Sequence, residues 1–215
     1  MTNQDDIVTT TGTGTVRATP DTAVLRLSVE VRQTALQAAY SGAAAAANRV
    51  VGDLLSAGVM RADVATSGLS LRSETVWREE RGQQVIAYVA STGLTVTVKE
   101  LERTPEVLDA VVLSAGDALR VHGLSLEVSN PAAAAAAAQE AAFDDARAAA
   151  ARLARRSGRE LGEVLRIDAS AFSAPGPPIP VARVALASSA EPMPVEAGET
   201  ELSASVTVTW RLAVA

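Results

Sequence analysis

The chain has 215 residues, with 25 acidic and 19 basic side chains, a formal net charge of −6 and no cysteine. This balance argues against a nucleic-acid binder that works through a basic surface, and the lack of cysteine excludes disulfides, thiolate metal sites and cysteine nucleophiles. Hydrophobic residues make up 48% of the sequence but aromatic residues only 3%, so a core must be built mainly from Ala, Val and Leu.

Two strands are predicted at the start of the chain. The first covers residues 11–17, Thr-Gly-Thr-Gly-Thr-Val-Arg, and the second covers residues 24–31, where apolar and polar side chains alternate. Thr19-Pro20-Asp21 lies between them and predicts a turn that folds one strand back on the other. Gly12 and Gly14 precede another strand and not a helix, which argues against a phosphate-binding loop. We expect them to ease a twisted or bulged strand.

Three helices are predicted from their start and stop residues. The first runs from Thr34, with Gln37 completing a capping box, to Gly58. The second has Thr104 as its N-cap and Pro105 in its first turn, and ends at Gly116. The third covers residues 130–158, beginning at Asn-Pro and ending at Ser-Gly.

The third helix is rich in alanine. A stripe of Phe143, Ala146, Ala150 and Leu153 is expected to form one buried face. The remaining Ala surface is explained by helix propensity, with a second contact face as the alternative.

Alternation predicts further strands at residues 69–77, 85–91, 94–98, 124–128 and 202–214. The first two flank a charged hairpin tip at residues 78–82, Arg-Glu-Glu-Arg-Gly. One apolar and one polar face on each strand is typical of a largely antiparallel sheet with helices on a single side. The sequence therefore predicts a single α+β domain over residues 7–214, with a mostly antiparallel sheet of about seven strands packed against three helices.

A proline-rich excursion is predicted at residues 173–198, because six of the nine prolines lie there. Within it, the apolar segment Val181 to Leu186 is expected to pack against the parent domain or a neighbouring subunit.

The sequence assigns no catalytic, cofactor-binding or metal-binding residue, and no cofactor. His122 is the only histidine and shares its face with Leu124 and Leu126, so we expect a partly buried, structural side chain. The acidic clusters lack calcium-loop spacing and are expected to be solvated. The alternative of a catalytic carboxylate pair, formed by residues distant in sequence, is left open by the sequence. These clusters are Asp144-Asp145, Glu79-Glu80 and Glu199 with Glu201.

An ordered set of short segments resembles one known family. The set comprises the Gly-x-Gly-x-Val strand with Pro20-Asp21, Leu54-Leu55-x-x-Gly58-Val59, Asp63-Val64-x-Thr66, an Ala-x-x-x-Ala-Arg-x-x-Ala-x-x-Leu-Ala helix before Leu161-Gly162-Glu163-Val164, and Pro194-Val195-x-x-Gly198-Glu199. It resembles the SIMPL-domain family, which includes bacterial periplasmic immunogenic and oxidative-stress-defence proteins. The resemblance implies an α+β fold, homo-oligomers in some bacterial members and no established enzymatic activity, and it supplies no catalytic residues.

These observations favour a non-catalytic, self-associating protein of cell-envelope or oxidative-stress physiology, with no nucleic-acid partner. The alternative is a binding module for a small apolar ligand or a client peptide, with Trp77, Tyr88 and Trp210 lining a cleft. No apolar run approaches the roughly 20 residues that cross a bilayer. As written, residues 1–6 lack the features of an export signal and predict a cytoplasmic protein, whereas a trimmed mature form would be periplasmic or extracellular.

Overall fold

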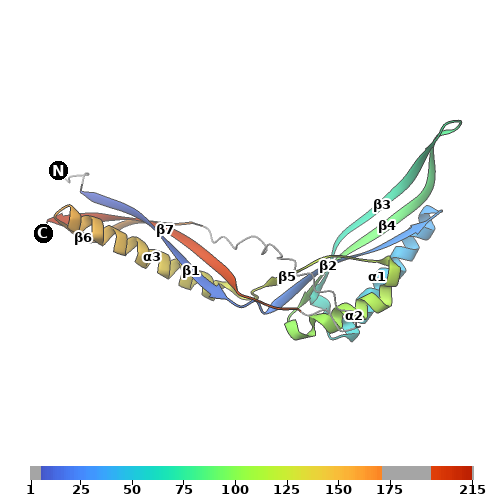
Figure 1. The fold of residues 1–215 in the computed structure, drawn as a ribbon, viewed down its shortest axis with the longest axis horizontal. Helices are drawn as coiled ribbons and strands as arrows, with labels where there is room; N and C mark the ends of the chain where they lie inside the picture. The colour runs from blue at the N-terminus through green and yellow to red at the C-terminus, as the bar shows by residue number, and fades with distance from the viewer. Residues whose placement is uncertain (1–5, 171–194, 215) are drawn as a thin grey trace, which may run out of the picture. The chain divides into compact units, whose positions relative to one another are not determined.

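The computed structural model describes residues 6–170 and 195–214, and within them it confirms the α+β class (Figure 1). The chain forms two compact units, each described by itself. The first unit contains β1 (Ile7–Ala18), α3 (Pro131–Arg156), β6 (Arg159–Ala169) and β7 (Thr200–Val214). The second contains β2 (Thr22–Gln33), α1 (Leu36–Ser56), β3 (Val64–Arg78), β4 (Gly82–Val98), α2 (Thr104–Ala115) and β5 (Leu119–Glu127).

Each unit has its own antiparallel sheet. The strand order is β1-β7-β6 in the first unit and β3-β4-β2-β5 in the second. The number of strands, their antiparallel pairing and the three helices are as predicted, but β6 was not among the predicted strand ranges, and the prediction of one shared sheet is wrong. That residues 7–214 behave as a single domain stays a prediction.

The predicted hairpin between the first two strands is also wrong. β1 pairs along its length with β7, from Ile7 opposite Arg211 to Ala18 opposite Thr200, whereas β2 pairs with β4 and β5. Side-chain alternation defines the two faces of a strand but not its neighbours. Pro20 and Asp21 connect the two units instead of closing a hairpin.

Small residues bring α3 against the sheet of the first unit. The buried residues of α3 are spaced four apart: Ala138, Ala142, Ala146, Ala150 and Ala154. A Cβ atom at Gly12 would overlap the backbone of Ala142 and Ala146, and one at Gly14 would overlap that of Ala138 and Ala142. Gly12 and Gly14 therefore allow close helix approach, which corrects the expectation that they ease a twisted strand.

The predicted buried stripe of α3 is only partly right. Ala146 and Ala150 are buried, but Leu153 is 53% exposed because it lies beside the alanine ridge and not on it. Phe143 is half-buried and packs on Trp210 of β7, with ring centroids 6.3 Å apart. This aromatic pair supplies the large side chains that the alanine ridge lacks.

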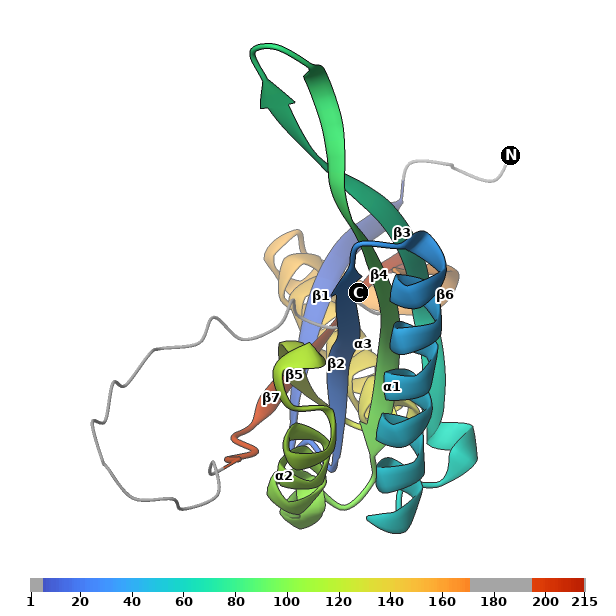
Figure 2. The same cartoon turned by 90° about the vertical axis from the view of Figure 1, so that its right-hand side faces the viewer.

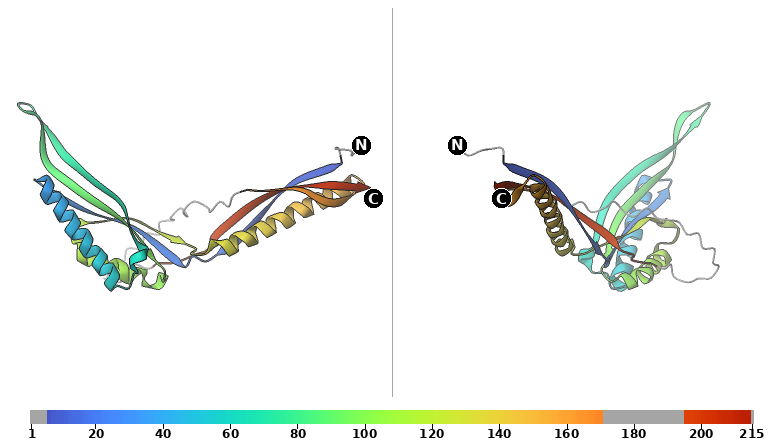
Figure 3. Two further views of the ribbon diagram at one scale, coloured as in Figure 1. Left: turned by 180° about the vertical axis from the view of Figure 1, so that it is seen from behind. Right: turned by 60° about the vertical axis from the view of Figure 1, so that its left-hand side comes forward.

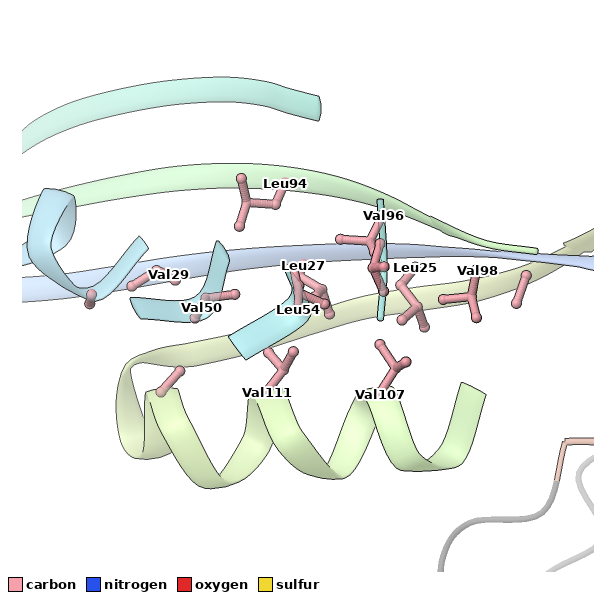
Figure 4. Close-up of a cluster of buried hydrophobic side chains, with 14 residues drawn as sticks. Leu25, Leu27, Val29, Val50, Leu54, Leu94, Val96, Val98, Val107 and Val111 are labelled. Carbon is pink, nitrogen blue, oxygen red and sulfur yellow. The ribbon is translucent and has the colours of Figure 1, made fainter. Parts of the chain in front are cut away.

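In the second unit, α1 and α2 cover one face of the four-stranded sheet (Figure 2). Leucine and valine side chains from two strands and two helices meet there, as predicted from the low aromatic content (Figure 4). The largest are Leu25, Leu27, Val29, Val50, Leu54, Leu94, Val96, Val98, Val107 and Val111. Residues 85–91 and 94–98, predicted as separate strands, form one strand, β4.

Two of the three predicted helix caps are wrong. The N-cap of α1 is Ala35, without a side-chain hydrogen bond, and not Thr34. α2 starts at Thr104 itself because a short 3-10 helix at Leu101–Arg103 leads into it, and the buried Thr104 hydroxyl has no hydrogen-bond partner in the part of the chain described. Asn130 caps α3 as predicted, since its side chain accepts from the Ala132 N–H at 3.3 Å.

The Gly14→Ala substitution should destabilise the first unit by about 1–3 kcal/mol, because the added methyl group overpacks the contact with α3. Gly123→Ala in β5 is the matched control, since a Cβ atom there meets nothing within 4 Å. Urea denaturation followed by circular dichroism measures both variants. Equal unfolding midpoints for the two variants would contradict the close packing.

Candidate functional site

The hairpin formed by β3 and β4 extends past the rest of its sheet (Figures 1 and 3). β4 has 17 residues, but β2 pairs only with Tyr88 to Val98. The segment from Gly82 to Ala87 is paired with β3 alone. The hairpin tip at Arg78 to Gly82 is as predicted, with the Arg81 N–H donating to the Arg78 carbonyl at 3.1 Å. A two-stranded ribbon without further cover is marginally stable in water.

One face of this hairpin is apolar and exposed. Leu71 lies opposite Ala90, which packs against Ala39 and Ala43 of α1, so Leu71 is on the helix-bearing face of the sheet. Residues of β3 that are an even number of positions from Leu71 point to the same face. Val85 of β4 also points there, because it lies opposite Thr75. The apolar members, named here the hairpin surface, are Leu69 (63% exposed), Leu71 (45%), Trp77 (74%) and Val85 (51%). Clustered apolar exposure of this kind marks interaction sites in soluble proteins.

The opposite face of the hairpin carries two ion pairs that connect β2 with β3 across β4. Arg32 Nε donates to Glu74 Oε2 at 2.7 Å, and an Arg72 guanidinium nitrogen donates to Glu30 Oε2 at 3.3 Å. Val89 lies in β4 between Arg32 and Arg72, and it is only 1% exposed. The aliphatic stems of the two arginines account for this burial, because such stems cover apolar surface while the charged ends stay in water.

His122 is exposed, and the expectation of partial burial beside Leu124 is wrong. β5 has a bulge at this point, since Arg26 faces Gly123 and Leu27 faces Val121. His122 is the extra residue, and a bulge re-aims its side chain. Its Nε2 shares a hydrogen bond of 2.7 Å with the hydroxyl of Ser28, which is itself buried.

A small pocket lies where α1 ends. Val59, Val98 and Val107 provide buried apolar walls to a volume of about 150 Å³. Lys99 and Asp63 form an ion pair of 2.9 Å at its rim. Arg103, also at the rim, donates to the Ala57 carbonyl at 2.6 Å and so satisfies a free acceptor at the helix C-terminus.

Asp21 ties together two ends of the second unit. Its carboxylate accepts from the Ser129 hydroxyl at 2.6 Å and from the Ser129 N–H at 2.7 Å. These hydrogen bonds, that of the hydroxyl first, lower the pKa of Asp21 below its usual value of 3.8. Asp21 and Ser129 also line a wider hollow of about 480 Å³ with Lys99 and Glu127.

The aromatic residues proposed to line one cleft have different surroundings in their own units. Trp77 is exposed on the hairpin surface, and Tyr88 packs with the alanines of α1. Trp210 belongs to the core of the first unit and is 2% exposed. None of the three lines either hollow described above.

The acidic clusters have separate, local partners. Asp145 accepts from the Thr13 N–H at 3.1 Å, and Glu199 pairs with Arg17 at 3.5 Å. Glu79 and Glu80 lie in the hairpin turn. In residues 6–170 and 195–214, no group of three His, Asp or Glu side chains is placed to hold a metal ion.

The apolar segment Val181 to Leu186 lies outside the described residues. Several contacts were not predicted from the sequence, namely Asp21 with Ser129, Ser28 with His122, and the crossed pairs of Arg32 and Arg72. A signal for the hairpin surface was present, because Leu69, Leu71 and Trp77 share one face of a predicted strand. What the alternation could not show is that α1 covers this face over β4 but leaves the side chains of β3 exposed.

Comparison with known proteins identifies the family. The sequence profile of the SIMPL family, described as a protein of unknown function (DUF541), matches residues 8–210. The chain belongs to the SIMPL family. It is 31% identical to the 26 kDa periplasmic immunogenic proteins of Brucella melitensis biotype 1 and Brucella abortus strain S19, over 99% of this chain and 87% of each relative. Among the described residues, no helix of this SIMPL protein combines the length and apolar character needed to cross a membrane.

The Asp21→Asn substitution should make the stability of the fold depend less on pH in the acid range. Because folding lowers the pKa of Asp21, the stabilisation is present above the unfolded-state pKa and is lost as the pH falls through the folded-state pKa. The wild-type urea midpoint should therefore fall more steeply between about pH 5 and pH 2 than that of Asp21→Asn. Ser129→Ala, which keeps the backbone donor, should give an intermediate slope. Identical slopes for wild type and Asp21→Asn would show that the two hydrogen bonds do not form.

Proposed function

We propose that this SIMPL protein is a non-catalytic, self-associating protein of the cell envelope, which acts through contacts between protein surfaces. The observation that carries the proposal is the hairpin surface: Leu69 is 63% exposed on the edge strand β3, and Trp77 is 74% exposed where β3 pairs with β4 beyond the end of β2. A second protein surface laid on these side chains would remove apolar area from water and stabilise the ribbon.

Periplasmic placement is part of this proposal. Both Brucella relatives are named periplasmic proteins, which supports the periplasmic alternative and lends no support to the cytoplasmic expectation. A chain without cysteine is compatible with an oxidising compartment, since it has no thiol to be oxidised or mispaired. A role in oxidative-stress physiology rests on the family resemblance alone.

The non-catalytic part of the proposal is supported by the surroundings of His122. A serine nucleophile is activated by a base that a third group orients. Ser28 and His122 are hydrogen-bonded, but none of the described carboxylates is hydrogen-bonded to His122. The pair therefore has the form of a structural contact that fixes the bulge of β5 to β2.

The double variant Leu69→Ser/Trp77→Ser should weaken self-association about ten-fold to a hundred-fold without unfolding the chain, because large exposed apolar side chains dominate interface energies. Light scattering after size exclusion, across a concentration series, measures the mass against the 22.1 kDa chain. Leu113→Ser is the matched control, since Leu113 is an 85% exposed leucine on α2. A wild-type protein that stays monomeric at high micromolar concentration would contradict self-association.

The pocket at the end of α1 supports a second candidate function, the binding of a small apolar ligand. Its walls of Val59, Val98 and Val107 are apolar, and its rim is charged. Native mass spectrometry of freshly purified protein tests this function. A ligand mass retained by the wild type and lost in Val59→Phe, which fills the pocket, would support it, and an unliganded mass in both would count against it.

A further inference from the structure

The outer edge of β3 is open. β3 is the first strand in the order β3-β4-β2-β5, and no described strand pairs with its other side. A long edge strand presents unpaired N–H and C=O groups that can receive another strand.

The regular part of this edge is bounded at both ends. Ser67 is an extra residue of β3, because Thr66 and Gly68 face the consecutive residues Leu94 and Gly93. At the other end, β3 stops at Arg78 before the turn. The second irregularity of this pairing comes from Ile86 on β4 and leaves β3 itself continuous. The regular edge therefore runs from residue 68 to residue 78, and Ser73 is its midpoint.

We propose that two copies of the chain associate by antiparallel pairing of their β3 edges over residues 68–78, with the two-fold axis at Ser73. This inference rests on the self-association proposed above and names the surface that performs it. The strand that pairs with this edge is β3 of a second copy, because the sequence of β3 is complementary to itself in this register.

The complementarity is visible on both faces. On one face, Arg72 of each copy lies opposite Glu74 of the other, so two ion pairs form. On the other face, Leu69 of each copy lies opposite Trp77 of the other, and Leu71 lies opposite Thr75. Cross-strand charge pairs and pairs with an aromatic residue each favour antiparallel association.

The neighbouring registers are disfavoured by charge. Residues that face each other across the two strands must point to the same face of the sheet. The two-fold axis can therefore pass through another residue of β3 but not between two residues. Moving the axis to Arg72 brings the two arginines together, and moving it to Glu74 brings the two glutamates together. Like charges directly opposite destabilise a strand pair, so charge favours the axis at Ser73 over both neighbouring registers.

The pairing would also extend the ion pairs within each copy. Arg72 is held by Glu30 and Glu74 by Arg32, and their side chains remain 54% and 34% exposed. The free sides of these charges can therefore reach the second copy. A linked row of charges is worth more than isolated surface pairs.

Single-cysteine variants test the register directly, because the wild type has no cysteine. Facing residues of an antiparallel pair have Cα atoms about 4.5–5.5 Å apart, within the range that a disulfide spans. Ser73→Cys should therefore form a disulfide-linked dimer on mild oxidation of the full chain. Ser70→Cys is the matched control on the same exposed strand, and its two copies would be six positions, or about 20 Å, apart.

The expected result is linking of Ser73→Cys several-fold above that of Ser70→Cys, on a non-reducing gel. Equal linking, or none, overturns the edge pairing. Light scattering of the same samples separates the two proposals: an assembly without the Ser73 link refutes only the register and edge, whereas a monomer refutes self-association as well. As an independent check, Leu71→Lys should lower the mass of the assembly, and Leu113→Lys should leave it unchanged.

Discussion

β4 extends beyond the strand and the helix that pack against it, β2 and α1. The exposed apolar side chains at the hairpin end of the second unit follow from this difference in length. From Tyr88 onward the strand has β2 on one side, β3 on the other and α1 over one face. Before Tyr88 it has β3 alone. Side chains that would be core residues in a covered sheet, such as Val85 and Trp77, are therefore exposed. On the other face, where β2 still flanks β4, Val89 lies between Arg32 and Arg72 and is buried under their aliphatic stems.

In the first unit, the helix and the sheet are packed by small residues. Glycine on β1 and alanine on α3 let helix and sheet backbones approach so closely that few large side chains are needed. Its open sheet face is lined by hydroxyls that pair with each other, with Thr9 and Thr209 2.9 Å apart and Thr11 and Thr207 2.8 Å apart. Between β1 and β7 that face is therefore polar, with its hydroxyls hydrogen-bonded to each other. The apolar side chains on β3 and β4 of the second unit have no such hydroxyl pairing, and the proposed contact surface is built from them.

Local signals predicted the elements well and their neighbours poorly. Period-two alternation and the Asn-Pro start identified α3 and the strands other than β6, because these signals depend on residues close in sequence, whereas exposure along β6 does not alternate. The pairing of β1 with β7 joins residues almost 200 positions apart, and the role of Gly12 and Gly14 depends on which helix lies above them. The bulge that exposes His122 and the missing cover over Leu69 are likewise set by tertiary packing, which alternation does not encode. The candidate surface could be anticipated as an apolar face but not as an exposed one.

Amide hydrogen exchange, measured by mass spectrometry as a function of protein concentration, tests the central claim most directly. If a second copy pairs with the open edge of β3, amides in residues 68–78 should exchange fast in dilute protein and become protected as the assembly forms. Amides in α2 should show no such change. Exchange in residues 68–78 that stays the same while light scattering reports a rising mass would contradict the account, because the contact would then lie elsewhere.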